Sequence, residues 1–473
     1  MSKYPYRQDR DELKELLQQY DNLKSGRSHS FIDEDSFEKI IDYFDEKDLL
    51  AKALEAAAYA IEQYPYSSTL LLKKCDLLIV NKKYKEALYY LEKAELLDSS
   101  DINLYILKTD AYLALDQQGK AASVLESALN YFEGDEKIEL LFELADVYDD
   151  YENFDKVFDC LKIILEIDPN SEEALYKICF WTDFTGRNEE GIRLHQEIIE
   201  EFPFNELAWF NLAAAYQGIK LYEKAIDAYL YAVAIDEKFD YALRNMGDAY
   251  LRLRKYKEAI EVLQKVLELA RPEDVIYEAI GHCFDKLQNY AQARFNYRKA
   301  AHLNLENDQL YFKIACTYMN EGVWESAIKN LQIAMRTRRM QPEYNLAMGQ
   351  CYMEQGKIQE AVQYFGNVVR TRPKNTNGWV ELLKCLYQAR CFEEGLEYVE
   401  HAIVLTNTKP VFIFYKCAFL LALGKSKEAI LQLETGMNKN PKLVKKLIEL
   451  NPSILQNQLV VDVIARFKRS KSI

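Results

Sequence analysis

One position recurs along almost the whole chain at a spacing of 34 residues, and it is nearly always small. We call it the small-residue column. Its members are Ala53, Ala87, Ala121, Val157, Gly191, Ala225, Ala259, Ala293, Ala327, Ala361, Gly395 and Ala429, and the only step that differs from 34 is one of 36 between Ala121 and Val157. A fixed period of this length is typical of an array of small units, each of which needs its neighbours to bury its apolar face. The sequence therefore predicts one repeat array over residues 33–441 rather than several globular domains.

Residues 205–237 show the internal pattern of one repeat most clearly. Apolar residues recur at i, i+3, i+4 and i+7 in two stretches, which predicts two amphipathic helices over residues 206–217 and 222–236. Gly218 lies in the break between them, where a residue that readily adopts a positive φ ends a helix. The small Ala213 and Ala225 allow the two helices to approach each other closely. We expect each repeat to be such a helix–turn–helix pair.

The spacing within this stretch resembles that of a known repeat family. Its key residues are Trp209, Leu212, Ala213, Tyr216, Ala225, Tyr229 and Ala232. They resemble the W-x2-L-G-x2-Y…A-x3-F pattern of the tetratricopeptide repeat (TPR), with Ala213 in place of the usual glycine. The resemblance implies an all-α, α-α superhelical solenoid of about twelve repeats, in which the first helices line a concave groove that holds a protein partner. In general style, such a long array resembles cytosolic TPR proteins of the Bacteroidetes.

Short segments flank the array on both sides. Residues 1–32 are expected to form an N-terminal helix, over residues 8–23, and a loop. This helix either caps the first repeat or docks in the groove and occupies it. Residues 442–473 are expected to form C-terminal capping helices and a basic tail. The 36-residue step suggests a longer loop near residues 133–137.

Several function classes find no support in the sequence. No apolar run reaches the roughly 18–20 residues needed to cross a membrane, and the first residues lack the apolar core of a signal peptide, so we expect a cytoplasmic protein without membrane contact. The nine cysteines form no CxxC pair and the five histidines show no ligand spacing, so we expect neither a metal nor a cofactor. Because no catalytic motif occurs, we expect no enzyme.

The charge of the chain is unevenly distributed. Residues 1–250 contain 27 basic and 52 acidic residues, whereas residues 251–473 contain 33 and 23, and the whole chain has a net charge of −15. Such an acidic chain argues against nucleic-acid binding, which depends on neutralising phosphates. We expect a protein or peptide partner instead. An alternative is a self-assembling structural protein in which acidic and basic halves pair head to tail. Partner identity and oligomeric state stay open.

One column of the expected first helices is acidic in four successive repeats. It contains Asp42, Asp76, Asp110 and Asp146, and Asp149 and Asp150 follow one turn later. Neighbouring helices pack about 8–10 Å apart, where two like charges in water repel by only about 0.4 kcal/mol. The row is therefore either a solvated face or a groove surface that attracts segments rich in Lys and Arg.

Aromatic and asparagine residues follow the acidic row along the expected inner surface. Phe142, Tyr176 and Phe210 share one column, with Phe180 and Phe184 beside it. They either pack between repeats or form an apolar pocket for a peptide side chain or helix. Asn211 and Asn245 share another column, a short version of the asparagine ladder that binds peptide backbone in the sugar-transferase branch of the family. The candidate groove residues are thus Asp76, Asp110, Asp146, Asp149, Phe142, Tyr176, Phe180, Phe210, Asn211 and Asn245.

Overall fold

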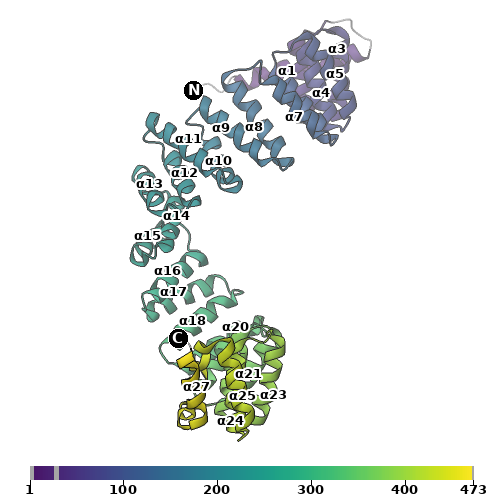
Figure 1. Cartoon of the computed structure of the whole chain (residues 1–473). Coiled ribbons are helices and arrows are strands. Elements are labelled where there is room, and N and C mark those ends of the chain that lie inside the picture. Colours follow the sequence, from purple (N-terminus) through teal and green to yellow (C-terminus); the bar gives the residue numbers. More distant parts are fainter. Residues whose placement is uncertain (1–4, 26–30, 471–473) are drawn as a thin grey trace. The chain divides into compact units, whose positions relative to one another are not determined.

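The computed structural model describes residues 5–25 and 31–470, and every regular element in that part of the chain is a helix (Figure 1). The chain divides into two compact units, residues 1–242 and residues 243–473, and each is described by itself. In both units, helical hairpins follow one another along the chain and pack on their sequence neighbours. The predicted fold class, an all-α solenoid of helix–turn–helix repeats, is therefore confirmed.

The first unit contains α1 (Pro5–Lys24) followed by six helix pairs. The even-numbered helix of each pair is the first helix of its repeat, and the odd-numbered helix is the second. The pairs are α2 (Glu34–Glu46) with α3 (Leu50–Gln63), α4 (Ser68–Val80) with α5 (Tyr84–Leu97), α6 (Ile102–Ala114) with α7 (Gln118–Ala128), α8 (Gly134–Asp150) with α9 (Phe154–Ile167), α10 (Glu172–Thr185) with α11 (Asn188–Glu201), and α12 (Glu206–Gly218) with α13 (Tyr222–Ile235).

The second unit begins within α14 (Asp240–Arg252) and continues the same alternation. Its further helices are α15 (Tyr256–Leu269), α16 (Asp274–Lys286), α17 (Tyr290–Leu303), α18 (Asp308–Asn320), α19 (Trp324–Thr337), α20 (Pro342–Glu354), α21 (Ile358–Thr371), α22 (Thr376–Gln388), α23 (Phe392–Leu405), α24 (Pro410–Ala422) and α25 (Ser426–Lys439). Two 3-10 turns, η1 (Pro441–Leu443) and η2 (Pro452–Gln456), and two helices, α26 (Val444–Leu450) and α27 (Gln458–Ser470), follow.

The small-residue column lies at the contact between the two helices of each repeat. All nine of its alanines are 0% exposed, and Val157 is 3% exposed. Such close packing leaves room for only a small side chain in most repeats, and this explains why the column keeps its period over the whole array.

Enlarging one alanine of this column should destabilise the protein locally. We expect Ala225→Leu in the first unit and Ala259→Leu in the second each to cost about 1–3 kcal/mol, because the added atoms overpack a close helix contact. Contacts in a repeat array are mainly between neighbours, so the loss should also split the melting transition in calorimetry. A melt like that of the wild type for both variants would show that the column does not lie at the contact.

The turn between the two helices has the same backbone geometry in every repeat. One residue, five positions before the small-residue column, has a positive φ. In the repeat of residues 205–237 this residue is Lys220, with φ of 64°, so the prediction that Gly218 makes the turn is wrong. Gly218 is the last residue of α12, where an added Cβ would lie 2.3 Å from Oδ1 of Asn188 on α11. Glycine is needed there for a close approach of two helices.

The 36-residue step lengthens a helix, so the predicted longer loop near residues 133–137 is also wrong. Helix α8 starts at Gly134 and has 17 residues, whereas α4, α6 and α12 have 13. The preceding α7 has 11 residues, against 14 in α5 and α9. Asp135 and Glu136 lie in the first turn of α8, where acidic side chains favour a helix start.

The helices at the two ends pack on the adjacent repeats. In α1, Tyr20 is buried and its ring contacts those of Phe44 and Tyr59, so the C-terminal half of α1 covers the first helix pair. This packing is that of a cap. At the other end, Val460 and Val463 of α27 join the core formed around Leu433 of α25. Most of the loop expected after the N-terminal helix, residues 26–30, and the last part of the basic tail lie outside the described residues.

None of the helices in the described part of the chain combines the length and the apolar content that a membrane span requires.

Candidate functional site

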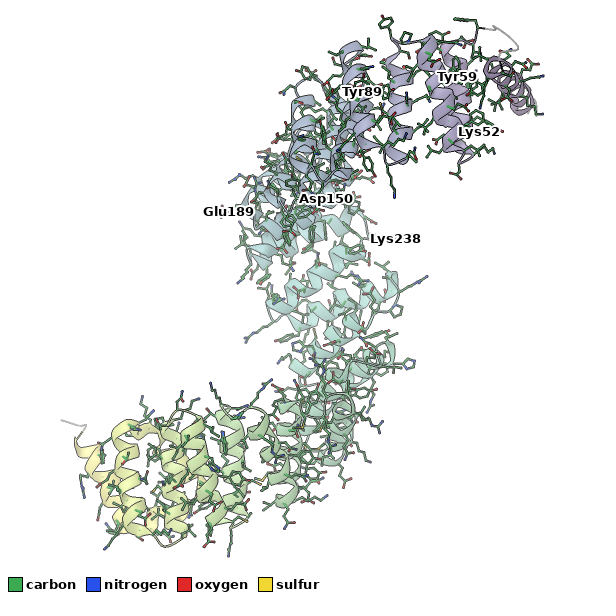
Figure 2. The ribbon with its side chains drawn as sticks, turned by 90° about the vertical axis from the view of Figure 1, so that its right-hand side faces the viewer. Lys52, Tyr59, Tyr89, Asp150, Glu189 and Lys238 are labelled. Atoms are coloured by element: carbon green, nitrogen blue, oxygen red, sulfur yellow. The ribbon has the colours of Figure 1, made fainter. Side chains whose placement is uncertain are left out.

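The acidic column predicted from the sequence lies on four successive first helices of the first unit. Asp42, Asp76, Asp110 and Asp146 belong to α2, α4, α6 and α8, and all four are exposed. Asp149 and Asp150, at the C-terminal end of α8, are exposed as well, and Asp150 is labelled in Figure 2. The two aspartates at the ends of the column have lysine partners. Lys73 pairs with Asp42, and Nζ of Lys177 lies 3.5 Å from a carboxylate oxygen of Asp146.

Both lysines occupy the same place in their repeats, fourteen residues before the small-residue column. We call this place the bridging column, because its side chains contact the preceding first helix. Asn211 also belongs to it and donates from Nδ2 to the carbonyl oxygen of Leu175 on α10, at 2.7 Å. Lys313 of the second unit pairs in the same way with Glu278. In these four repeats the residue of the bridging column thus pairs with, or donates a hydrogen bond to, the first helix of the preceding repeat.

Of the four repeats that follow an aspartate of the acidic column, two lack a cation at this place. The bridging column holds Leu107 after Asp76 and Glu143 after Asp110. Among the residues that the structure describes, neither Asp76 nor Asp110 has an ion pair. We call Asp76, Asp110 and Glu143 the acidic centre. It combines the two aspartates of the acidic column that have no ion pair with the carboxylate that occupies the bridging column after Asp110.

The electrostatics of the acidic centre reflect this missing charge. Partial desolvation, and secondarily the charge of Asp45, raise the pKa of Asp76 above its ordinary value, although Lys73 offsets part of the effect. Desolvation and the charge of Asp76 raise the pKa of Asp110. Desolvation, Asp110 and Asp146 raise the pKa of Glu143. The ionised form of each carboxyl group is thus less stable than it would be in water, and a nearby cation would stabilise it.

Sequence reasoning missed two carboxylates of this surface, Glu143 and Asp45. The signal for Glu143 was its position in the bridging column. The repeats on either side of Leu107 and Glu143 carry lysine at this position. The signal for Asp45 was its position in the same column as Asp149, eight residues before the small-residue column.

The predicted aromatic residues are divided between packing and exposure. Phe210 contacts the rings of Tyr229 and Phe239, with centroid distances of 5.8 and 5.1 Å. Phe142 lies beneath Lys177, whose Nζ is 5.0 Å from the ring centroid. In contrast, Tyr176 and Phe180 of α10 are 62% and 60% exposed.

Phe180 belongs to a group of four rings that we call the aromatic cluster. Its members are Phe154, Phe180, Trp181 and Phe184. Phe154 stacks on Trp181 at 5.2 Å, and Phe180 stacks on Phe184 at 5.6 Å. Phe184 is 57% exposed. The rings therefore support one another on one side and face solvent on the other.

The asparagine pair does not present two free amides. Asn211 is 3% exposed and already uses its Nδ2 in the bond to Leu175. It cannot donate that group to a bound chain without giving up the contact between repeats. Asn245 lies half-buried on α14, in the second unit.

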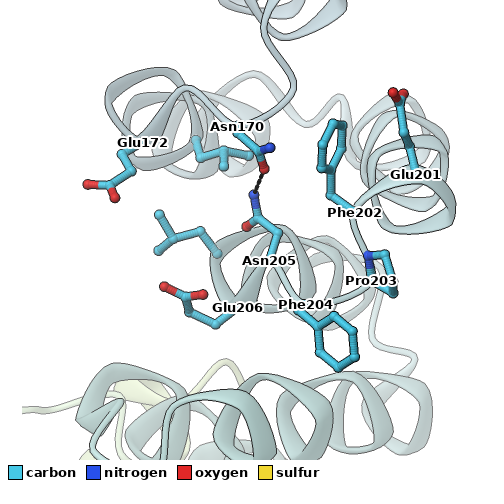
Figure 3. Close-up of a pocket in the computed structure, with 10 residues that line it drawn as sticks. Asn170, Glu172, Glu201, Phe202, Pro203, Phe204, Asn205 and Glu206 are labelled. Carbon is cyan, nitrogen blue, oxygen red and sulfur yellow. Dashed lines mark hydrogen bonds between the residues drawn. The ribbon is translucent and has the colours of Figure 1, made fainter.

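A cavity of about 510 Å³ lies between the turns that precede α10 and α12 (Figure 3). Its wall includes the rings of Phe202 and Phe204 and the carboxylates of Glu172, Glu201 and Glu206. Nδ2 of Asn205 donates to Oδ1 of Asn170 at 2.9 Å across the cavity, and Oδ1 of Asn205 caps α12 by accepting from the amide of Ala208. The asparagines thus hold the two turns together, and the sequence analysis did not predict this cavity.

Other chemistry is sparse in the described residues. They contain no group of three or more His, Cys, Asp or Glu side chains placed to hold a metal ion. The nine cysteines are free thiols, and eight of them are buried or half-buried. Burial raises the pKa of Cys75 and of Cys417 to about 12, which disfavours the reactive thiolate.

Two sequence families match parts of the chain. The family described as the C-terminal ARM domain of tetratricopeptide repeat protein 21 matches residues 211–347. A family described as a tetratricopeptide repeat matches residues 345–375. No curated protein matches the chain.

Three of the solved structures to which the chain is similar follow. The C-terminal part of a TPR repeat-containing protein from Cytophaga hutchinsonii is 17% identical, with 54% of this chain and 99% of that chain covered and a TM-score of 0.42. YrrB, described as a TPR protein with an unusual peptide-binding site, is 19% identical, with 39% and 95% covered and a TM-score of 0.35. The Cut9–Hcn1 hetero-tetramer of APC/C is 11% identical, with 84% and 96% covered and a TM-score of 0.35.

Proposed function

The chain belongs to the tetratricopeptide-repeat family, whose helical arrays serve as protein-interaction scaffolds, and on this premise we propose that its acidic centre binds a Lys- or Arg-rich segment of a partner protein. The observation that carries the proposal is the missing cation in the bridging column. Lys73 and Lys177 neutralise Asp42 and Asp146, whereas Leu107 and Glu143 offer no ion-pair partner to Asp76 and Asp110. A basic side chain of the partner would take the place that lysine takes in the neighbouring repeats.

Physical chemistry favours this occupant for two reasons. The raised pKa values of Asp76, Asp110 and Glu143 mean that the fold disfavours their charged forms, so binding of a cation recovers interaction energy that the isolated protein lacks. The carboxylates also remain near solvent, so a partner residue reaches them without a large desolvation penalty. Opposite charges 4 Å apart attract by about 1 kcal/mol in water and by about 4 kcal/mol near a protein surface.

Neutralising the acidic centre should weaken binding of a basic peptide. The probe is a fluorescein-labelled peptide with six Lys and Arg residues separated by Gly and Ser, and the readout is fluorescence anisotropy. We expect the combined variant Asp76→Asn, Asp110→Asn and Glu143→Gln to lose affinity at least about tenfold, which is about 1.4 kcal/mol. Its melting temperature should not fall, because the substitutions remove mutual repulsion.

A matched control separates this site from general charge attraction. The control variant, Glu92→Gln with Glu197→Gln and Asp227→Asn, also removes three negative charges, but from exposed positions on second helices. This control should bind the peptide within about twofold of the wild type, and binding by the wild type should weaken as salt shortens the screening length. Equal losses in both variants would contradict the proposal. Light scattering at low salt, run on the same samples, would reveal the alternative, head-to-tail self-assembly.

A further inference from the structure

The aromatic cluster is an apolar surface that the first unit leaves uncovered. Its members Phe180 and Phe184 follow Tyr176, which is not part of the cluster, at successive turns of α10. All three rings are between 57% and 62% exposed. Large aromatic side chains normally bury most of their surface, and a contiguous exposed group of them is typical of a protein interaction site. Phe154 and Trp181 support the exposed rings from behind, so the surface is held in place before anything binds.

The unpaired charges near the aromatic cluster in the sequence are all acidic. Asp149 and Asp150 end α8, Glu152 lies in the turn before Phe154, and Asp183 lies between Trp181 and Phe184. All four are exposed, and none has an ion pair among the described residues. The basic side chains nearest in sequence are already paired. Lys156 pairs with Glu126, Lys177 pairs with Asp146 and Glu173, and Arg187 pairs with Asp159 and Glu190. An occupant that buries the rings must therefore bring its own cations.

We propose that the aromatic cluster is a second docking point for the same basic partner segment, and that it binds a large apolar side chain flanked by Lys or Arg. This deepens the proposed function and rests on it, because both docking points are assigned to one segment. The apolar side chain covers Phe180 and Phe184, and the flanking cations meet Asp149, Asp150 and Asp183. An arginine suits this role, since its planar guanidinium stacks on aromatic faces and also binds carboxylates.

Geometry sets a minimum length for such a segment. The acidic column continues in register from Asp110 on α6 to Asp146 on α8 and then to Phe180 on α10, which occupies the equivalent position. Two steps between adjacent first helices amount to roughly 20 Å. An extended chain advances about 3.3 Å per residue, so about six residues must separate the basic group from the apolar anchor.

The test compares four labelled peptides by fluorescence anisotropy on the full-length protein. One carries the basic group alone. Two carry it with a tryptophan anchor flanked by arginine, separated by two or by eight Gly/Ser residues, and one carries the anchor alone. We expect the peptide with the eight-residue spacer to bind at least about tenfold more tightly than the basic peptide. The peptide with the two-residue spacer should show little of this gain in affinity, because it cannot reach both sites.

Variants then assign the gain to the rings. Phe180→Ser and Phe184→Ser should remove it, whereas Tyr89→Ser, which changes an equally exposed tyrosine on α5, should keep it. If the anchored peptide binds no better than the basic one while Asp76→Asn with Asp110→Asn still weakens both, the proposed function stands and the aromatic docking point is wrong. If no basic peptide binds the wild type, both proposals fail. If Tyr89→Ser removes the gain as fully as Phe180→Ser does, the rings of α10 are not the specific contact.

Discussion

Gly395→Ala should destabilise the protein by about 1–3 kcal/mol, although alanine is the ordinary residue of the small-residue column. An added Cβ at this position would lie 2.1 Å from Cε1 of Phe419, which is fully buried on α24. The ring cannot move away easily, because Phe392 and Tyr387 border it in the same core. Chemical denaturation with a probe for the second unit would measure the loss.

A second glycine in the same unit provides a control of opposite sign. Gly366 lies inside α21, and an added Cβ there would meet no atom within 4 Å. Gly366→Ala should therefore stabilise the protein by up to about 1 kcal/mol, since alanine is the better helix former. The account of the packing would be wrong if both substitutions shifted stability in the same direction.

Stability should also fall as the solution becomes acidic, and His195 should account for a large part of the loss. This histidine of α11 is 0% exposed, and neither Nδ1 nor Nε2 has a hydrogen-bond partner among the described residues. Burial lowers its pKa from the ordinary value to about 3. The unfolded chain therefore takes up a proton near pH 6.5 while the folded chain does not, and stability is lost as the pH falls from about 6.5 toward 3.

The size of this effect is measurable. Between pH 7 and pH 5 the linkage amounts to about 2 kcal/mol. His195→Leu should remove this part of the pH dependence and should also raise stability at pH 7, because two unsatisfied polar atoms leave the core. The exposed His302 offers the control His302→Gln, which should melt like the wild type at both pH values. A wild-type pH dependence in His195→Leu would show that the histidine is not the responsible group.

The fold was predictable because its main determinant is periodic. The pattern around Trp209 predicts helices over residues 206–217 and 222–236, and the structure has Glu206–Gly218 and Tyr222–Ile235. The turn was not predictable from glycine, because Lys220 adopts the positive φ while Gly218 makes room for Asn188 of the preceding repeat. Such a contact joins residues 30 positions apart, so no local sequence pattern indicates it.

The candidate site was predictable only in outline. The acidic column was visible in the sequence, but which of its aspartates are neutralised depends on contacts with the next repeat. Lys73 lies 31 residues after Asp42, and Lys177 lies 31 residues after Asp146. The equivalent place after Asp76 holds Leu107. A comparison of two columns one repeat apart would have identified the acidic centre, whereas each column alone does not. The burial of Asn211 could not be foreseen, because an asparagine in this column is compatible with either a free or a bonded amide.

The most direct measurement uses a variant with lysine at the two positions of the bridging column that follow Asp76 and Asp110. In the variant Leu107→Lys with Glu143→Lys, the new lysines should pair with Asp76 and Asp110 as Lys73 pairs with Asp42. The control, Leu96→Lys with Glu92→Lys, adds the same charge at exposed positions on α5. We expect the basic peptide to bind the first variant at least about tenfold more weakly than the control, with no loss of thermal stability. Equal binding by the two variants would contradict the claim that Asp76 and Asp110 bind a basic side chain of a partner.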